Sequence, residues 1–202
     1  MTRLRLVVGA IAVTLALVLV ATFTIGCRGR ENKGEQDSAQ GIVDMELMAF
    51  LSEARALHHQ ANLKEESNDL PGATTAMQRL VTARRPHEGK TTPEIEEVLA
   101  DAYARLAELQ LRQGALEAAA EAVKNGLAHA PEPTYFRGHL IEVEGLVEEA
   151  RAAGLADAGK PEEAARAREK AIQLLEQVIR IQDQVIQRSL AARDAGATEG
   201  AR

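Results

Sequence analysis

Residues 106–131 of this chain read LAELQLRQGALEAAAEAVKNGLAHAP, which predicts two helices that fold back on each other at Gly114. Apolar residues recur three or four positions apart on both sides of the glycine, so each set lies on one helical face. The two sets are Leu106, Ala107, Leu109 and Leu111, and then Leu116, Ala119, Val123 and Leu127. Alanines dominate the second segment, so the two backbones can approach closely. Pro131 cannot continue a helix and ends the pair.

The composition favours helices throughout the chain. Of its 202 residues, 46% are hydrophobic but only 2% are aromatic, and there is no tryptophan. A core with so few rings must be filled by aliphatic side chains, which suits packed helices better than a β-sandwich. The length is sufficient for one domain of ordinary size. A net charge of −6 argues against a nucleic-acid interface.

Two other segments repeat the pattern of helix, turn and helix. The turn signal NDLPG begins at Asn68, and the signal GKPE begins at Gly159. Together with Gly114, the turns are spaced 46 and 45 residues apart, which predicts a repeat architecture. Three such units are about the minimum that buries a continuous core. We therefore expect an all-α fold over residues 42–192, an array of about three antiparallel helical hairpins.

Local signals predict where several helices begin and end. The first helix is expected at 42–66, and the second ends before residue 84. Thr92 followed by Pro93 predicts the start of the next helix, because threonine is a good N-cap and proline suits the first turn. Another helix is expected to begin at residue 133 or 134.

The hairpin at 106–131 resembles one tetratricopeptide (TPR) repeat. The positions that match are Leu106, Ala107, Gly114, Leu116, Ala119, Val123, Gly126 and Pro131. This family usually has an aromatic residue where the chain has Gln110, and an alanine where it has Gly126. Its period is about 34 residues, which is shorter than the spacing found here. The resemblance implies a divergent, TPR-like α-solenoid.

The N-terminal residues predict export and attachment to a membrane. Two arginines precede a continuous apolar run at 6–25, which is the arrangement of a secretory signal. The sequence TIGC at 24–27 resembles a bacterial lipobox, with threonine where leucine is usual. The resemblance implies that residues 1–26 are removed and that Cys27, the single cysteine of the chain, carries the lipid.

An uncleaved membrane anchor fits the same apolar run. A run of this length can cross a hydrocarbon core of about 30 Å, and basic residues on both sides leave its orientation undecided. Both interpretations place the remainder outside the cytoplasm. Residues 27–41 are almost free of apolar side chains and are expected to form a flexible tether. Arg28 stands where some lipoproteins carry an inner-membrane Asp, so the resemblance favours the outer membrane, facing the periplasm; the alternative is a single-pass inner-membrane protein with a periplasmic domain.

The last helix, expected at 161–192, carries apolar residues seven positions apart. The rows are Ile172, Ile179 and Ile186, then Leu174 and Ile181, then Val178 and Val185. Two interpretations stay open: the stripe covers the end of the array, or it forms a coiled-coil seam with a partner or a second copy. Residues 193–202 are expected to be a disordered tail.

The sequence contains no motif that predicts catalysis. Metalloprotease, Walker, nucleophile-elbow and CxxC motifs do not occur. His58 and His59 are adjacent, so they point about 100° apart on a helix and would not share a metal. The pairs Glu96-Glu97 and Glu148-Glu149 are expected on solvated faces. We expect no enzymatic activity, no cofactor and no metal site.

The TPR resemblance implies a binding surface on the inner side of the first helix of each hairpin. By position, that surface comprises Arg55, His58, Asn62, Asp101, Ala104, Glu108, Leu111, Arg112, Leu146, Glu149 and Ala153. The expected function is a membrane-anchored adaptor or scaffold that binds partner proteins during assembly of a bacterial envelope complex, such as a pilus, a secretion channel or the outer-membrane machinery. The alternatives are a structural lipoprotein that forms a coiled coil through 161–192, with a second copy as a possible partner, and an accessory subunit of an envelope enzyme.

Overall fold

The computed structural model describes residues 34–86, 90 and 92–199, and the side chains of 45–86, 90 and 92–193. The chain divides into two compact units, Met1–Asp44 and Met45–Arg202. In the first unit only the helical backbone from residue 34 is described. The predicted signal segment and Cys27 lie outside the described residues. None of the helices described is both long enough and apolar enough to cross a membrane.

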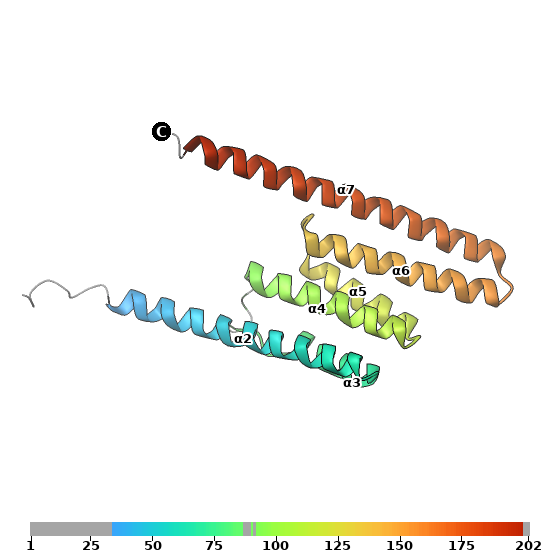
Figure 1. Ribbon diagram of the computed structural model, residues 1–202, viewed down its shortest axis with the longest axis horizontal. Helices are drawn as coiled ribbons and strands as arrows, with labels where there is room; N and C mark the ends of the chain where they lie inside the picture. Colours follow the sequence, from blue (N-terminus) through green and yellow to red (C-terminus); the bar gives the residue numbers. More distant parts are fainter. Residues whose placement is uncertain (1–33, 87–89, 91, 200–202) are drawn as a thin grey trace, which may run out of the picture. The chain divides into compact units, whose positions relative to one another are not determined.

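The described residues form six α-helices and no strand, which confirms the predicted all-α fold (Figure 1). The helices are α2 (Gly34–Glu66), α3 (Leu70–Val81), α4 (Pro93–Arg112), α5 (Leu116–His129), α6 (Tyr135–Asp157) and α7 (Pro161–Glu199). The second unit begins within α2, at Met45, and consists of three antiparallel hairpins (Figure 1). They pair this part of α2 with α3, α4 with α5, and α6 with α7. Within the second unit, α4 packs against α3, α5 and α6, and α6 also packs against α5 and α7.

Each hairpin reverses at a residue with left-handed backbone. Asn68 has a φ of 60°, and Gly114 and Gly159 both have a φ of 73°. At all three turns, the amide of this residue donates to the carbonyl three residues back, and the next amide donates to the carbonyl five back from itself. This pair of bonds defines the Schellman motif, which favours Gly or Asn because other side chains are strained there. The predicted turns are confirmed, and all three are built alike.

Helix starts agree with the capping signals. Thr134 accepts a hydrogen bond from the Arg137 amide at 3.3 Å and caps α6. Thr92, directly before Pro93 at the start of α4, has the extended backbone of an N-cap, but its side chain accepts no capping hydrogen bond from the helix. Asp69 caps α3 by accepting from the Gly72 amide at 2.9 Å.

The core of the second unit consists mainly of alanine and leucine. One cluster of buried apolar side chains extends from α2 to α6. Its fully buried members include Ala61, Met77, Leu80, Ala107, Leu109, Ala119, Leu140 and Val143. Burial of one leucine or methionine side chain is worth about 1.5–3 kcal/mol. Residues 106–131 supply the last part of α4 and all of α5 to this cluster, as the spacing predicts.

Gly126 of α5 lies where three helices come close together. A Cβ atom at this position would stand 2.4 Å from Cδ2 of Leu140 in α6 and 2.8 Å from Cβ of Tyr103 in α4. Such distances are well inside van der Waals contact, so even the alanine that TPR repeats usually carry would not fit without a shift of its neighbours. The departure from the family pattern therefore has a steric cause.

Two helices extend further than predicted. The expected tether at 27–41 is helical from Gly34 onward, because α2 begins there. The expected tail at 193–202 is helical as far as Glu199. Both segments contain Ala, Glu, Gln or Arg, which are good helix formers, and adding residues to an existing helix is much easier than starting one. The remaining tether and tail residues lie outside the described part.

Gly126→Ala should destabilise the protein by about 1 kcal/mol, because overpacking of about 1–3 kcal/mol exceeds the helix propensity gained. Gly154→Ala is the matched control, since a Cβ atom there meets nothing within 4 Å. This control should stabilise α6 by about 0.5–1 kcal/mol. Urea unfolding followed by circular dichroism measures both. Equal stabilisation by the two changes would contradict the close packing at Gly126.

Candidate functional site

A groove of about 690 Å³ lies between the second half of α4 and the middle of α6. It is lined by Arg105, Glu108, Leu111, Arg112, Leu146, Glu149, Ala150 and Ala153. We call it the α4–α6 groove. On each helix every lining residue has another lining residue three or four positions away, so each helix presents one face to the groove. The two alanines leave space beside Leu146, whose side chain is 42% exposed.

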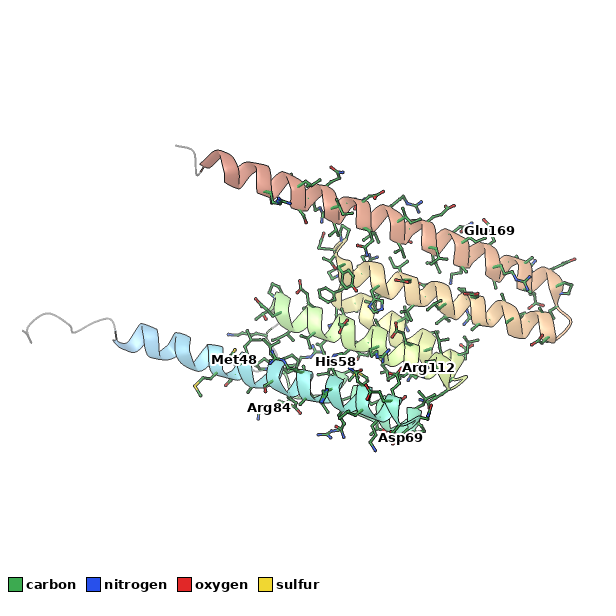
Figure 2. The ribbon with its side chains drawn as sticks, viewed as in Figure 1. Met48, His58, Asp69, Arg84, Arg112 and Glu169 are labelled. Atoms are coloured by element: carbon green, nitrogen blue, oxygen red, sulfur yellow. The ribbon has the colours of Figure 1, made fainter. Side chains whose placement is uncertain are left out.

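A second groove, of about 400 Å³, lies between the beginning of α4 and α2. We call it the α2–α4 groove; its lining is Leu51, Ala54, Arg55, His58, Glu94, Glu97, Val98, Asp101 and Phe136. His58 lies on the side of α2 that faces α4, with its Nε2 atom 3.6 Å from Oδ2 of Asp101 (Figure 2). Burial lowers the pKa of His58 and outweighs the attraction of Asp101, so the structure favours the neutral imidazole.

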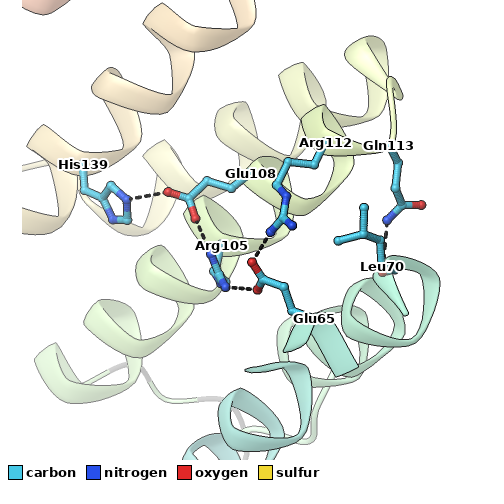
Figure 3. A network of polar contacts seen from close by, with 7 residues as sticks. All are labelled: Glu65, Leu70, Arg105, Glu108, Arg112, Gln113 and His139. Carbon is cyan, nitrogen blue, oxygen red and sulfur yellow. Dashed lines mark hydrogen bonds and ion pairs between the residues drawn. The ribbon is translucent and has the colours of Figure 1, made fainter. Parts of the chain in front are cut away.

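A chain of charged side chains links the three first helices of the hairpins (Figure 3). Glu65 at the end of α2 accepts hydrogen bonds from Arg105 and Arg112 of α4. Arg105 also donates to Glu108 at 3.0 Å. Glu108 in turn lies 3.2 Å from Nε2 of His139 in α6. Positive and negative side chains alternate in this charged chain, so each partly buried charge has an opposite charge beside it.

The pKa shifts in this network favour charged partners. Burial alone would raise the pKa of Glu108, but hydrogen bonds from His139 and Arg105 outweigh it and hold the pKa below its usual value. The bond to Glu108 raises the pKa of His139 despite burial of the imidazole, and Asp101 and Glu142 act in the same direction. The network therefore couples α4 to α6 most strongly when the histidine is protonated.

Most of the predicted surface residues line one of the two grooves. Glu108, Leu111, Arg112, Leu146, Glu149 and Ala153 line the α4–α6 groove. Arg55, His58 and Asp101 line the α2–α4 groove. Asn62 is exposed on α2 and lines neither groove. Ala104 is fully buried in the core, so its predicted place on the surface is wrong. Its small side chain is instead used for packing between helices.

Sequence reasoning missed three members of the charged chain. Arg105 could have been found, because it lies three residues before Glu108 and seven before Arg112 on one face of α4. Glu65 and His139 give no such signal. Their partners are 31 to 47 residues away in the sequence, and only the packing of α2 and α6 against α4 brings them together.

Of the glutamates predicted on solvated faces, Glu96 is partly buried and Glu148 is buried. Glu96 lies 2.7 Å from Nδ1 of His129, whose ring stacks on Tyr103 with centroids 5.5 Å apart. Glu148 is only 4% exposed. It accepts from Arg151 at 2.6 Å and from Lys170 of α7 at 2.9 Å. Each carboxylate links its helix to a neighbouring helix, Glu96 of α4 to α5 and Glu148 of α6 to α7.

No protein-family model and no curated protein matches this chain. Among the residues described, no group of three or more His, Cys, Asp or Glu side chains is placed to hold a metal ion. The functional conclusion therefore rests on the two grooves and on the residues that line them.

The contribution of the His139–Glu108 pair to stability should depend on pH. Since the pKa of His139 is raised, its contribution is complete below the usual pKa of about 6.5 and is lost as pH rises through the raised value. Since the pKa of Glu108 is lowered, its contribution is present above about 4.3 and is lost as pH falls through the lowered value.

We expect the wild type to lose about 1 kcal/mol more unfolding free energy than His139→Asn between about pH 5.5 and about pH 9. Urea unfolding at both pH values measures the difference. The control is His59→Asn, at an exposed position of α2. It should show the same change in unfolding free energy between the two pH values as the wild type. The same pH dependence in His139→Asn and in the wild type would show that the pair contributes nothing.

Proposed function

We propose that this protein is a membrane-anchored adaptor whose α4–α6 groove binds a segment of a partner protein in a bacterial envelope. The observation that carries the proposal is the groove itself. It exposes apolar side chains, above all Leu146, between charged groups of both signs. Exposed apolar surface rimmed by polar groups is typical of protein-binding sites.

The chemistry of the groove indicates the kind of segment it would accept. Leu111, Leu146 and Ala150 offer an apolar floor for one or two large aliphatic or aromatic side chains. Arg112 and Glu149 stand beside this floor, on α4 and α6 respectively. A bound segment would therefore carry an apolar anchor with flanking charges, and an amphipathic helix or an extended strand both meet this requirement.

The charged chain supports the proposal because it gives the groove a fixed wall. Arg105 and Arg112 are both held by Glu65, and Glu108 is held by Arg105 and His139. A site whose side chains are already ordered loses less conformational entropy when a ligand binds. The arginines and Glu108 are thus suited to positioning a partner.

The proposed attachment to the membrane rests on the sequence alone. Cys27 after a secretory signal would carry a lipid, and Arg28 favours the outer membrane. A relation to TPR adaptors remains part of the proposal, supported by the repeated Schellman turns and by the helical hairpins.

A photo-reactive residue at position 150 tests the groove in cells. The side chain of Ala150 is exposed and lines the α4–α6 groove. Cross-linking from this position should give a discrete product with a partner, and Leu146→Glu should reduce the yield at least tenfold. The control for the cross-linking position is Lys124 on α5, which lies outside the groove. The control for Leu146→Glu is Leu63→Glu, which places the same charge at another exposed leucine. Equal products from positions 150 and 124 would exclude a specific groove.

Labelling with radioactive palmitate tests the anchor. The full-length chain should incorporate the label when expressed in a bacterium that modifies lipoproteins, and Cys27→Ser should not incorporate it. Label that persists in Cys27→Ser would exclude lipidation at this residue. Absence of label from the unaltered chain would instead favour the uncleaved membrane anchor.

A further inference from the structure

Helix α7 has a buried apolar face that packs against α6 and a second apolar face that is about half exposed, from which Leu175 also reaches Gly145 of α6. The inner face is small and buried: Ala164, Ala167, Ala171 and Ile181 are all less than 9% exposed. The outer face carries Ile172, Leu175, Ile179, Ile186 and Leu190, which are 52%, 45%, 61%, 53% and 46% exposed. We call these five residues the outer stripe. The predicted isoleucine row at 172, 179 and 186 is thus exposed and does not cover the end of the helical array. The end of the array is covered by Ile181 and the buried alanines of the inner face.

The outer stripe is long enough to form a helical interface. From residue 172 to residue 190 it extends about 27 Å along the helix, at about 1.5 Å per residue. A narrow stripe with a period near seven residues is the pattern by which two helices pair. We propose that the outer stripe pairs with the same stripe of a second copy of this chain, in antiparallel orientation. This inference does not depend on the proposed adaptor function.

The spacing of the stripe favours an antiparallel pair. Leu175, Ile179, Ile186 and Leu190 are separated by four, seven and four residues, a pattern that reads the same in both directions. A two-fold axis between positions 182 and 183 places Leu175 opposite Leu190 of the second copy. The same axis places Ile179 opposite Ile186. An interface with two-fold symmetry requires such a self-complementary surface.

Charges beside the stripe favour the same orientation. A parallel pair in register would set Arg168 and Arg193 each opposite its own copy, and like charges so placed repel. Asp183 lies beside its own copy in either orientation and does not discriminate between them. In the antiparallel pair, Arg193 of the second copy faces Ile172, with Glu169 and Glu176 about one turn away on either side. Glu169 lies on the side of α7 that faces away from α6, where a second copy can reach it (Figure 2).

Cysteine cross-linking tests both the pairing and its direction in the full-length chain. Leu175→Cys and Leu190→Cys are each introduced beside Cys27→Ser, and the proteins are purified in detergent. In the antiparallel pair, position 175 is opposite position 190, and two copies of position 175 are about 22 Å apart along the axis. A bismaleimide too short to span that distance should cross-link an equal mixture of the two variants, and neither variant alone.

Other outcomes would overturn the proposal. Cross-linking of each variant alone, with no increase in the mixture, would indicate a parallel pair. Absence of any cross-linked dimer, while both thiols still react with a monofunctional maleimide, would exclude self-pairing through the stripe. The stripe would then belong to a helix of another protein or to a lipid surface.

A charge placed in the stripe provides the matched comparison. Ile179→Glu, added to both cysteine variants, should lower the cross-linked yield at least tenfold. Gln173→Glu adds the same charge at an exposed position of α7 outside the stripe and should leave the yield unchanged. Circular dichroism should detect the same helix content in both, because each changed side chain is exposed in the single chain. An equal yield from Ile179→Glu and Gln173→Glu would contradict pairing through the stripe.

Discussion

Close contact between helix backbones is the constraint on which the second unit depends. The chain has almost no aromatic side chains, so its core gains apolar contact by bringing helices close together rather than by filling wide gaps. Gly126 is the extreme case, because it touches α4 and α6 where no Cβ atom fits. Alanines at 104, 107 and 119, all fully buried, serve the same purpose elsewhere. The identical Schellman turns then repeat this packing from one hairpin to the next.

Helices packed through such small side chains could slide along one another, because alanine surfaces carry few features that fix a register. The charged chain from Glu65 through Arg105 and Glu108 to His139 supplies those features. Partly buried ion pairs add little net stability but strongly disfavour arrangements that leave one charge without its partner. The charged chain thus fixes α2, α4 and α6 relative to one another. This fixed arrangement defines the shape of the α4–α6 groove.

The position of α7 explains its two apolar faces. In the first two hairpins the second helix packs against the first helix of the next hairpin, as α3 does with α4 and α5 with α6. Among the described residues, no helix follows α7 and packs against it in the same way. Its inner face is attached to α6 through small residues and through the ion pair of the buried Glu148 with the half-exposed Lys170. Its outer isoleucines are left exposed, and a second copy would bury them.

The sequence by itself determined the helices and their turns, because helical periodicity and the tolerance of Gly and Asn for left-handed backbone are local properties. The resemblance to TPR repeats also indicated most residues of the α4–α6 groove. Sequence-based prediction was wrong where contacts between residues far apart in the sequence determine which side chains are buried. Glu148 and Ala104 looked like surface residues, yet packing buries both. The partners of Glu65 and His139, and the face of α7 that meets α6, were decided only by the tertiary structure, because they depend on how helices far apart in the sequence come together.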